Sequence, residues 1–400
     1  MKPIYIAAYH QSKFGKLMGM TVPQIVDAAI QSACRQVDAP ASALDVGSIG
    51  AACNFSLNRQ GLLAGLMAMT PGLEGKPMEA VENACATGGQ AVLSVIQKLQ
   101  LGMGHTGIAV GYEKMRDAEG KMDGKLIGKV LGYFSYPDER EGKTFIFPHI
   151  FAEIMQAYMA EYGVTERDLA HIAVQEYANA RSNPWAQMQK VSITVDDAMR
   201  IEGINRYVVD GLPLKTYDCS QITDGYAALI LATEEGLARL GVSKQDCVEI
   251  AGYSQATDPL ARAGRDVLRP VGARRAMSNA YRMAGVAPED VNVAEVHDCF
   301  TVMGALGTEV IGKAAEGLGA RYWLEGKAGP DGECGINTSG GLIAKGHPVG
   351  ATGIAMIGWS ALQLRGKAPA ALQVKNARAA ATFNIGGPVC ASVCTVLKPA

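Results

Sequence analysis

Hydrophobic and polar positions along the chain alternate between strand-like and helix-like patterns, and the same succession occurs twice. Residues 4–15 and 248–259 are each an apolar strand pattern that leads into a polar loop, and the two segments match in pattern. A helical pattern follows in each copy, at about 22–37 and 273–284, and then a second strand pattern at 46–52 and 291–296. The chain therefore contains an internal repeat, and its halves are expected to fold alike.

Each half continues with a small-residue turn, a helix and a strand. In the first half the turn holds Cys85, the helix ends near Gly102, and a strand is expected at 108–111. In the second half the turn holds His347, the helix ends near Leu364, and a strand is expected at 380–383. Each half reads as β-α-β-α-β, which predicts an α/β fold with mixed or parallel sheets covered by helices.

The segment 116–217 lies outside the repeat and is more charged than its surroundings. We expect an insertion packed on the first half, with a helix near 150–162 and an N-cap at Thr165 for the next helix. The predicted organisation is a first half made of 1–115 and 218–247, an inserted domain at 116–217, and a second half at 248–400.

Composition excludes several classes of protein. A formal net charge of -2 on 400 residues provides no basic field for nucleic acid or an anionic membrane. The nine cysteines are odd in number and scattered, which argues against a disulfide framework. The chain has neither a signal peptide nor the ~20-residue apolar run that spans a bilayer, so cytoplasm is the expected location.

Cys85 is the first candidate for chemistry, because its turn runs directly into an apolar helical pattern. The N–H groups and dipole at a helix N-terminus favour an anion. This predicts a depressed pKa and a nucleophilic thiolate. A buried structural cysteine is the alternative interpretation.

Three other stretches resemble loops that present catalytic groups: Glu295–Phe300 at a strand end, Gly346–Gly350 before a helix, and Asn384–Gly387. The repeat predicts that equivalent sheet ends converge, bringing together Cys85, His297, Cys299, His347 and Gly386. This set suggests acyl transfer through a thioester. Cys85 would attack a carbonyl, His347 would take its proton, and His297 and backbone N–H groups would stabilise the oxyanion. Cys299, with an ordinary thiol pKa of ~8.5, would be the second acid/base.

These residues allow two other interpretations. A lone histidine such as His347 is more often structural. A zinc site made of Cys85, His297, Cys299 and His347 is conceivable, but the spacing along the chain is not that of a structural zinc site.

These residues resemble the thiolase superfamily over essentially the whole chain. Asn83–Gly88 is similar to the nucleophile motif of that family, and Gly346–Gly353 to its histidine motif. The resemblance implies duplicated halves in a five-layered αβαβα arrangement. It also implies that 116–217 is the loop domain that covers the site and binds coenzyme A.

The chain departs from ordinary thiolases at two places. It has His297-Asp298-Cys299-Phe300 where they have Asn-Glu-Ala-Phe, and Asn384-Ile385-Gly386 where they have Cys-x-Gly. The first pattern is typical of thiolases of the sterol-carrier-protein-2 type. It implies that Cys85 carries the acyl group, His347 activates it and Cys299 is the acid/base. His297 would belong to one oxyanion hole, and the N–H groups of Cys85 and Gly386 to the other.

The function implied is transfer of an acyl group between a 3-oxoacyl-CoA and coenzyme A, which is a substrate; no metal or organic cofactor is expected. One kind of relative cleaves aromatic 3-oxoacyl-CoA esters, so the resemblance also implies aromatic or branched candidates for the substrate, such as benzoylsuccinyl-CoA. The resemblance implies a homodimer. Some relatives work with a small zinc-ribbon/OB-fold partner subunit, and such a partner is the other candidate for an assembly. A retro-aldolase or another Claisen-type acyl-CoA enzyme working with such a partner is an alternative, although the retro-aldolases generally lack the cysteine found here at Cys85. A non-catalytic acyl-CoA-binding subunit is the other.

Overall fold

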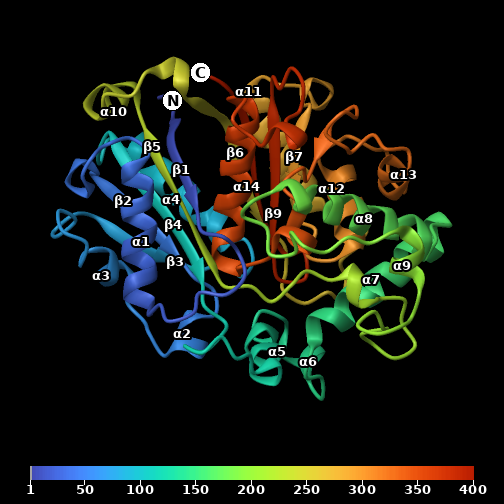
Figure 1. Cartoon of the computed structure of the whole chain (residues 1–400). Helices are drawn as coiled ribbons and strands as arrows, with labels where there is room; N and C mark the ends of the chain where they lie inside the picture. The colour runs from blue at the N-terminus through green and yellow to red at the C-terminus, as the bar shows by residue number, and fades with distance from the viewer. Residues whose placement is uncertain (1) are drawn as a thin grey trace.

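The computed structural model describes residues 2–400 and places ten strands in one sheet (Figure 1). In chain order they are β1 (Tyr5–Gln11), β2 (Val46–Gly50), β3 (Met78–Val81), β4 (Thr106–Glu113), β5 (Gly225–Ala232), β6 (Val248–Thr257), β7 (Val293–Val296), β8 (Gly335–Ile336), β9 (Ala380–Gly386) and β10 (Ala391–Pro399). Their spatial order is β3-β2-β4-β5-β1-β6-β10-β9-β7-β8.

The two halves of the sheet repeat one topology. The order β3-β2-β4-β5-β1 becomes β8-β7-β9-β10-β6 when each number is raised by five, which is the second half read from its own edge. β2 is parallel to β3 and β4, as β7 is to β8 and β9, whereas β5 and β10 are antiparallel to both neighbours. The predicted repeat is confirmed, and the halves join where Tyr5 and Ile6 pair with Glu249 and Val248.

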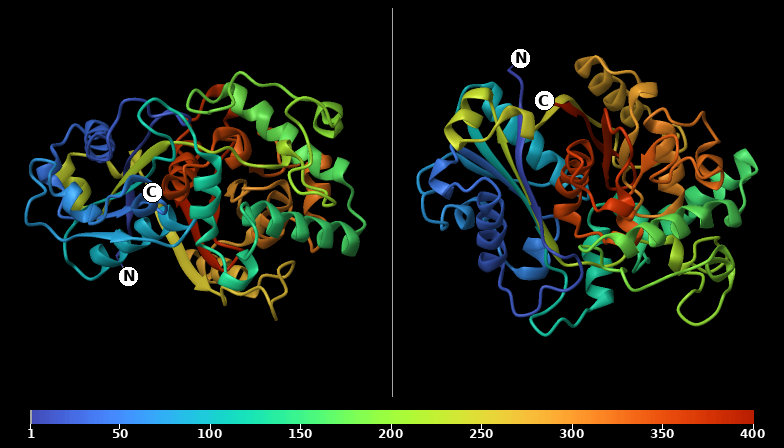
Figure 2. Two further views of the ribbon diagram at one scale, coloured as in Figure 1. Left: turned by 90° about the horizontal axis from the view of Figure 1, so that it is seen from below. Right: turned by 45° about the horizontal axis from the view of Figure 1, so that its top comes forward.

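Helices form three layers around these two half-sheets (Figures 1 and 2). α4 (Thr87–Gln100) packs on β2 and β4, α14 (Val349–Leu364) packs on β4, β5, β7 and β9, and the two helices contact each other. α1 (Val22–Arg35) covers the first half, and α11 (Val271–Ala284) covers β6 and β10 of the second. The expected five-layered αβαβα arrangement is therefore confirmed. Shorter helices outside the inserted segment are α2 (Asn54–Asn58), α3 (Leu63–Met67), α10 (Glu234–Leu240), α12 (Thr301–Val310) and α13 (Gly319–Leu324).

Glycines bring the two central helices unusually close. A Cβ at Gly88 of α4 would lie 2.8 Å from the carbonyl oxygen of Gly350, and a Cβ at Gly353 of α14 would lie 2.3 Å from the amide nitrogen of Gly89. Any larger residue would push the helices apart, because real Cβ atoms do not approach backbone this closely. The contact holds the starts of α4 and α14 together, and with them the two turns that precede these helices.

The inserted segment contains α5 (Gly124–Gly132), α6 (Pro137–Arg140), α7 (Ile146–Tyr162), α8 (Glu166–Ser182) and α9 (Val195–Met199). Thr165 caps α8 as predicted. The expectation that the segment packs on the first half is wrong for its two long helices, because α7 and α8 lie against α12, and α8 also against α13, in the second half. α12 is buried along its whole length, so its apolar surface needs this cover. The boundaries of the inserted domain stay a prediction.

Within residues 2–400, none of the helices has the length and apolar character required to cross a membrane.

Candidate active site

Side-chain hydrogen bonds fix the backbone conformation of the turn that carries Cys85. Ala84 has a φ of +47°, in the left-handed region that residues with a Cβ rarely adopt. The hydroxyl of Thr87 accepts from the N–H of Asn83 at 2.8 Å and donates to the carbonyl of Ala84 at 2.6 Å. α4 begins at Thr87, so the prediction that Cys85 lies beside a helix N-terminus is confirmed. The Cys85 side chain lines a cavity of about 510 Å³.

His347 occupies the matching turn before α14. The hydroxyl of Thr352 lies 2.7 Å from Nδ1 of His347 and 3.1 Å from the carbonyl oxygen of Pro348. A carbonyl can only accept, so the hydroxyl donates to Pro348 and accepts from Nδ1–H of His347. The Nε2 atom of His347 therefore carries a lone pair, which is the form of imidazole that can take a proton.

His297, directly after β7, has the opposite tautomer. The amide nitrogen of Asn384 lies 3.0 Å from the carbonyl oxygen of Cys85 and 2.9 Å from Nδ1 of His297. The carbonyl must face a donor, which fixes the orientation of the amide. Nδ1 of His297 therefore accepts, and its Nε2 carries the proton. This Nε2 is buried and has no hydrogen-bond partner within the described part of the chain.

Cys85 and the two histidines meet at one point. The sulfur of Cys85 and one ring nitrogen of each histidine lie within 4.8 Å of one another. The rings of His297 and His347 meet edge to face, with centroids 5.0 Å apart. The two turns and the end of β7 therefore converge as the internal repeat predicts, although the three residues are far apart in the sequence.

Cys299 lines the same cavity as these three residues. Asp298, between His297 and Cys299, turns away and accepts N–H groups of Leu342 and Ile343 at 2.8 and 3.1 Å. Gly386 ends β9 at the same place, and its neighbour Gly387, rather than Gly386 itself, lines the cavity.

The predicted depressed pKa of Cys85 is wrong. Burial of the thiol raises its pKa to about 12, helped by the carboxyl groups of Glu113 and Glu82, while the N–H of Gly387 only partly offsets them. Desolvation and negative neighbours thus outweigh the helix N-terminus. Glu113 lies in the core behind the site and accepts backbone N–H groups of Cys53 and Gly350 at 2.9 and 3.0 Å.

The other three groups are also neutral at rest. Burial, with the charge of Lys345 nearby, lowers the pKa of His347 to about 3. Burial and the neighbouring His347 hold the pKa of His297 well below its ordinary value. Burial raises the pKa of Cys299 well above the ordinary thiol value, so the expectation of an ordinary thiol pKa of ~8.5 for this residue is wrong. A thiol and an imidazole lie together without forming an ion pair.

Alkylation of the free protein tests this neutral state. Because the pKa of Cys85 is raised to about 12, the thiolate fraction should rise about tenfold per pH unit between pH 7 and 9, with no plateau. The measurement is the rate of iodoacetamide labelling at Cys85, followed by peptide mapping. A plateau near neutral pH would mean a depressed pKa. Fully buried Cys394 is the internal control and should stay unlabelled.

Several residues of the cavity were not singled out from the sequence. Cys219 is a third cysteine on its wall, joined to the loop of Cys299 by the N–H of Ser220, which donates to the Cys299 carbonyl at 2.9 Å. One side is aromatic: Phe151 and Phe300 stack with centroids 4.6 Å apart. Further apolar lining comes from Met115, Met122, Ile127, Leu131, Phe145, Ile146, Phe147, Val208 and Val349.

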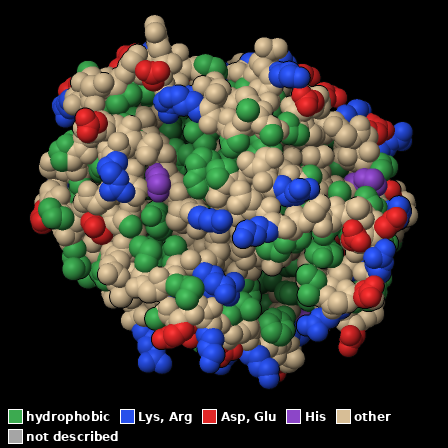
Figure 3. All heavy atoms as spheres, viewed as in Figure 1, with side chains coloured by type: hydrophobic (Ala, Val, Ile, Leu, Met, Phe, Trp, Pro, Cys, Tyr) green, Lys and Arg blue, Asp and Glu red, His purple; other side chains and the backbone are tan. Residues whose placement is uncertain are grey.

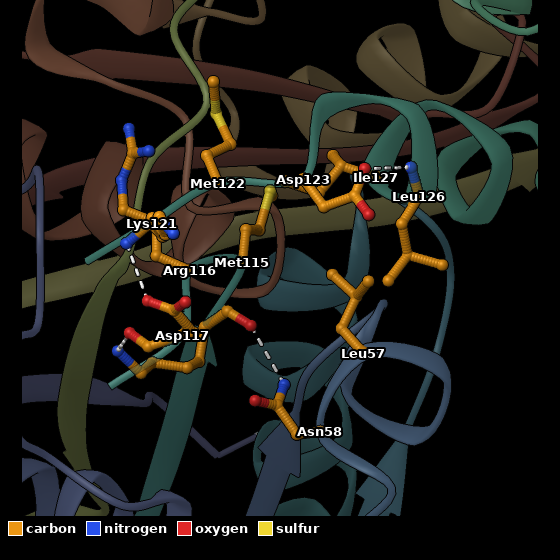
Figure 4. Close-up of a pocket in the computed structure, with 11 residues that line it drawn as sticks. Leu57, Asn58, Met115, Arg116, Asp117, Lys121, Met122, Asp123, Leu126 and Ile127 are labelled. Carbon is orange, nitrogen blue, oxygen red and sulfur yellow. Dashed lines mark hydrogen bonds between the residues drawn. The ribbon is translucent and has the colours of Figure 1, made fainter. Parts of the chain in front are cut away.

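A second cavity, of about 310 Å³, adjoins the first, and Met115, Arg116, Met122 and Ile127 line both (Figure 4). Arg116 donates to the carbonyl of Ile222 at 2.8 Å, and this hydrogen bond holds its positively charged guanidinium group where the two cavities meet. Lys121 lines the second cavity and Arg206 the first. Figure 3 shows Lys and Arg side chains gathered near the middle of one face, above a recess with hydrophobic walls.

The close group of Cys85, His297 and His347 has the donor types of a metal site. A metal-bound histidine must present a lone pair to the ion. His347 can do so, but the contact with Asn384 puts the proton of His297 on its free nitrogen, Nε2. The hydrogen-bonding pattern therefore suits a base and a donor better than two ligands.

Two family profiles match the sequence: Thiolase, N-terminal domain, over residues 4–235, and Thiolase C-terminal domain-like, over residues 254–399. The chain belongs to the thiolase family. It is an acyltransferase of the thiolase type, as the resemblance implied.

Curated relatives match along the whole chain. An acetyl-CoA acetyltransferase of Methanothermobacter thermautotrophicus is 34% identical over 97% of both chains. Sterol carrier protein 2 of Bos taurus is 30% identical over 96% of this thiolase and 70% of its own length. Among solved structures, the Ltp2-ChsH2(DUF35) aldolase has the same fold, with a TM-score of 0.79 at 20% identity over 99% of this chain and 98% of the other.

Proposed function

We propose that this thiolase cleaves a 3-oxoacyl-CoA with coenzyme A, or runs the reverse condensation, through a thioester on Cys85. The observation that carries the proposal is the meeting of a thiol with two neutral histidines of opposite tautomer within 4.8 Å. His347 presents an acceptor that can take the thiol proton, and His297 presents a donor for a developing oxyanion.

In the first half-reaction, the sulfur of Cys85 bonds to C3 of the substrate and the thiol proton passes to Nε2 of His347. The backbone N–H groups of Cys85 and Gly386 would hold the oxygen on C3, because that carbon is bonded to the Cys85 sulfur. The bond between C2 and C3 then breaks, and its electrons move to C2 and the thioester oxygen. Nε2–H of His297 would stabilise that oxygen, and Cys299 would donate its proton to C2.

The second half-reaction restores the starting protonation of Cys85, Cys299 and His347. The thiol of coenzyme A gives its proton to the Cys299 thiolate and attacks the thioester on Cys85. The Cys85 sulfur leaves and takes back the proton held by His347. Coenzyme A is a substrate here, and the steps require no metal or organic cofactor.

The lining of the larger cavity favours a bulky acyl group. Its lining includes four phenylalanines and several aliphatic residues: Phe145, Phe147, Phe151, Phe300, Ile127, Leu131, Ile146, Val208, Ile222 and Val349. Aromatic faces pack well against another ring. We propose an aromatic or branched 3-oxoacyl-CoA, of which benzoylsuccinyl-CoA is an example, with the phosphates of coenzyme A towards Arg116 and Lys121. A homodimer, a small zinc-ribbon/OB-fold partner and a cytoplasmic location remain part of the proposal.

The test is the intact mass of the protein after mixing with acetoacetyl-CoA and with longer and aromatic 3-oxoacyl-CoA esters. We expect a gain of one acyl group, mapped to Cys85, with the largest amount of adduct from bulky esters. An adduct on another cysteine would contradict the proposed mechanism. No adduct with any ester, with or without a partner subunit, would favour the retro-aldolase or the non-catalytic alternative.

A further inference from the structure

We propose that Asn384 is a positioning residue that sets the tautomer of His297 and ties it to the nucleophile turn. The proposal rests on the proposed function. Asn384 belongs to β9 in the second half, yet its amide nitrogen contacts the carbonyl of Cys85 in the first half at 3.0 Å and Nδ1 of His297 at 2.9 Å. One NH₂ group thus serves both parts of the site.

The oxygen of the Asn384 amide does not explain why asparagine lies here. Oδ1 is buried and accepts no hydrogen bond from the described residues. It lies where α4 and α14 cross: a Cβ at Gly353 would be 2.2 Å from it, and one at Gly89 would be 3.0 Å away. A buried oxygen without a donor is unfavourable for stability. The favourable contacts of this side chain are therefore the two made by its nitrogen.

The two contacts require two hydrogens on one atom. The Cys85 carbonyl and the Nδ1 lone pair of His297 can both only accept while His297 is neutral, so an NH₂ group satisfies both. An ionised carboxylate at position 384 would accept instead and would attract the His297 proton to Nδ1. The lone pair would then lie on Nε2, facing the cavity, where it would repel the substrate oxygen on which negative charge develops.

Asn384 also explains why the two histidines have different chemical roles. Thr352 accepts from Nδ1–H of His347 and leaves its Nε2 free to act as a base. Asn384 donates to Nδ1 of His297, so that its Nε2–H can donate. Both rings are buried and neutral, so the hydrogen bonds at Nδ1 decide which form each one takes. Reversing either tautomer would leave the site with two bases or two donors.

The direct test is the tautomer of His297 in protein with ¹⁵N-labelled histidine. The chain has only six histidines, and the signal of His297 is identified by its loss in His297→Gln. We expect wild type to show a protonated Nε2 and a bare Nδ1. In Asn384→Asp the proton should move to Nδ1, or the ring should become doubly protonated. This measurement needs no substrate, so it decides the proposal even if no acyl-enzyme forms.

Kinetics provide the second readout. Asn384→Asp and Asn384→Ala should slow carbon–carbon cleavage of a 3-oxoacyl-CoA by about 10²-fold or more, the scale of losing one oxyanion donor. Exchange of labelled coenzyme A into a saturated acyl-CoA should be less affected, because that step places its oxyanion on the backbone N–H groups. In a His297→Gln background the same changes at Asn384 should add little further loss.

Asn292→Asp is the matched control. Asn292 is also a buried asparagine of the second half whose nitrogen donates to a carbonyl, that of Asn376, at 2.8 Å, but it lies outside the site. A loss of activity in both aspartate variants would indicate general destabilisation. An unchanged His297 signal in folded Asn384→Asp, or losses that multiply in full with His297→Gln, would overturn the proposal.

Discussion

Replacing Cys85 by alanine is expected to abolish the acyl-enzyme and to lower thiolysis by about 10⁴-fold or more, the scale on which enzymes lose activity without their covalent nucleophile. No other cysteine of residues 2–400 has the same position relative to the two histidines. Cys85 alone has its sulfur within 4.8 Å of ring nitrogens of both His297 and His347 among the residues described. The measurement is the intact mass after mixing with a 3-oxoacyl-CoA, together with the steady-state rate.

The fold should survive this change. The Cys85 side chain lines a cavity, so truncation leaves no closed void, and the loss of stability should stay below about 1 kcal/mol. Thermal unfolding of Cys85→Ala beside wild type checks that expectation. Cys53→Ala is the matched control, because Cys53 is buried next to Glu113 but does not line the cavity. An acyl adduct on Cys219 or Cys299 in folded Cys85→Ala would contradict the assignment of the nucleophile.

Much of this site could be predicted from the sequence because its parts occupy equivalent places in a repeat. Cys85 and His347 each precede the central helix of one half, and the topology makes those helices neighbours. His297 and Cys299 follow a strand whose counterpart in the first half is β2. Convergence of these residues follows once the halves are known to pack face to face.

What the sequence did not reveal depends on tertiary contacts. The helix N-terminus beside Cys85 is a local feature and suggested a low pKa, whereas the burial and the Glu113 carboxyl that raise it come from elsewhere in the fold. The contact between Asn384 and Cys85 spans 299 positions of sequence, and no pattern of residues marks it. The packing of α7 and α8 could not be predicted for a similar reason, because the apolar surface that they cover belongs to α12.

Replacing Cys299 by alanine is expected to separate the two kinds of chemistry in the cycle. Transfer of an acyl group from a saturated acyl-CoA to Cys85 starts with Cys299 protonated, because no carbon has taken its proton. The Cys85 proton can then pass through His347 to the leaving coenzyme A sulfur, so this transfer should continue without Cys299. Cleavage of a carbon–carbon bond needs a proton donor at C2, and should fall by about 10²- to 10⁴-fold, the usual contribution of a general acid. The measurements are exchange of labelled coenzyme A into acetyl-CoA and the cleavage rate of acetoacetyl-CoA.

Exchange of the C2 hydrogens of acetyl-CoA with deuterated water gives the sharpest comparison. It needs a base at C2 but no acyl transfer, so Cys299→Ala should lose it. Cys219→Ala is the matched control, since Cys219 lines the same cavity and its thiol donates to the Lys215 carbonyl at 3.3 Å. If Cys219→Ala loses hydrogen exchange and Cys299→Ala keeps it, the acid/base is Cys219. If both variants keep it, the proton at C2 is handled by a histidine, and the raised pKa of the Cys299 thiol, which makes it a poor base at rest, would reflect a structural cysteine.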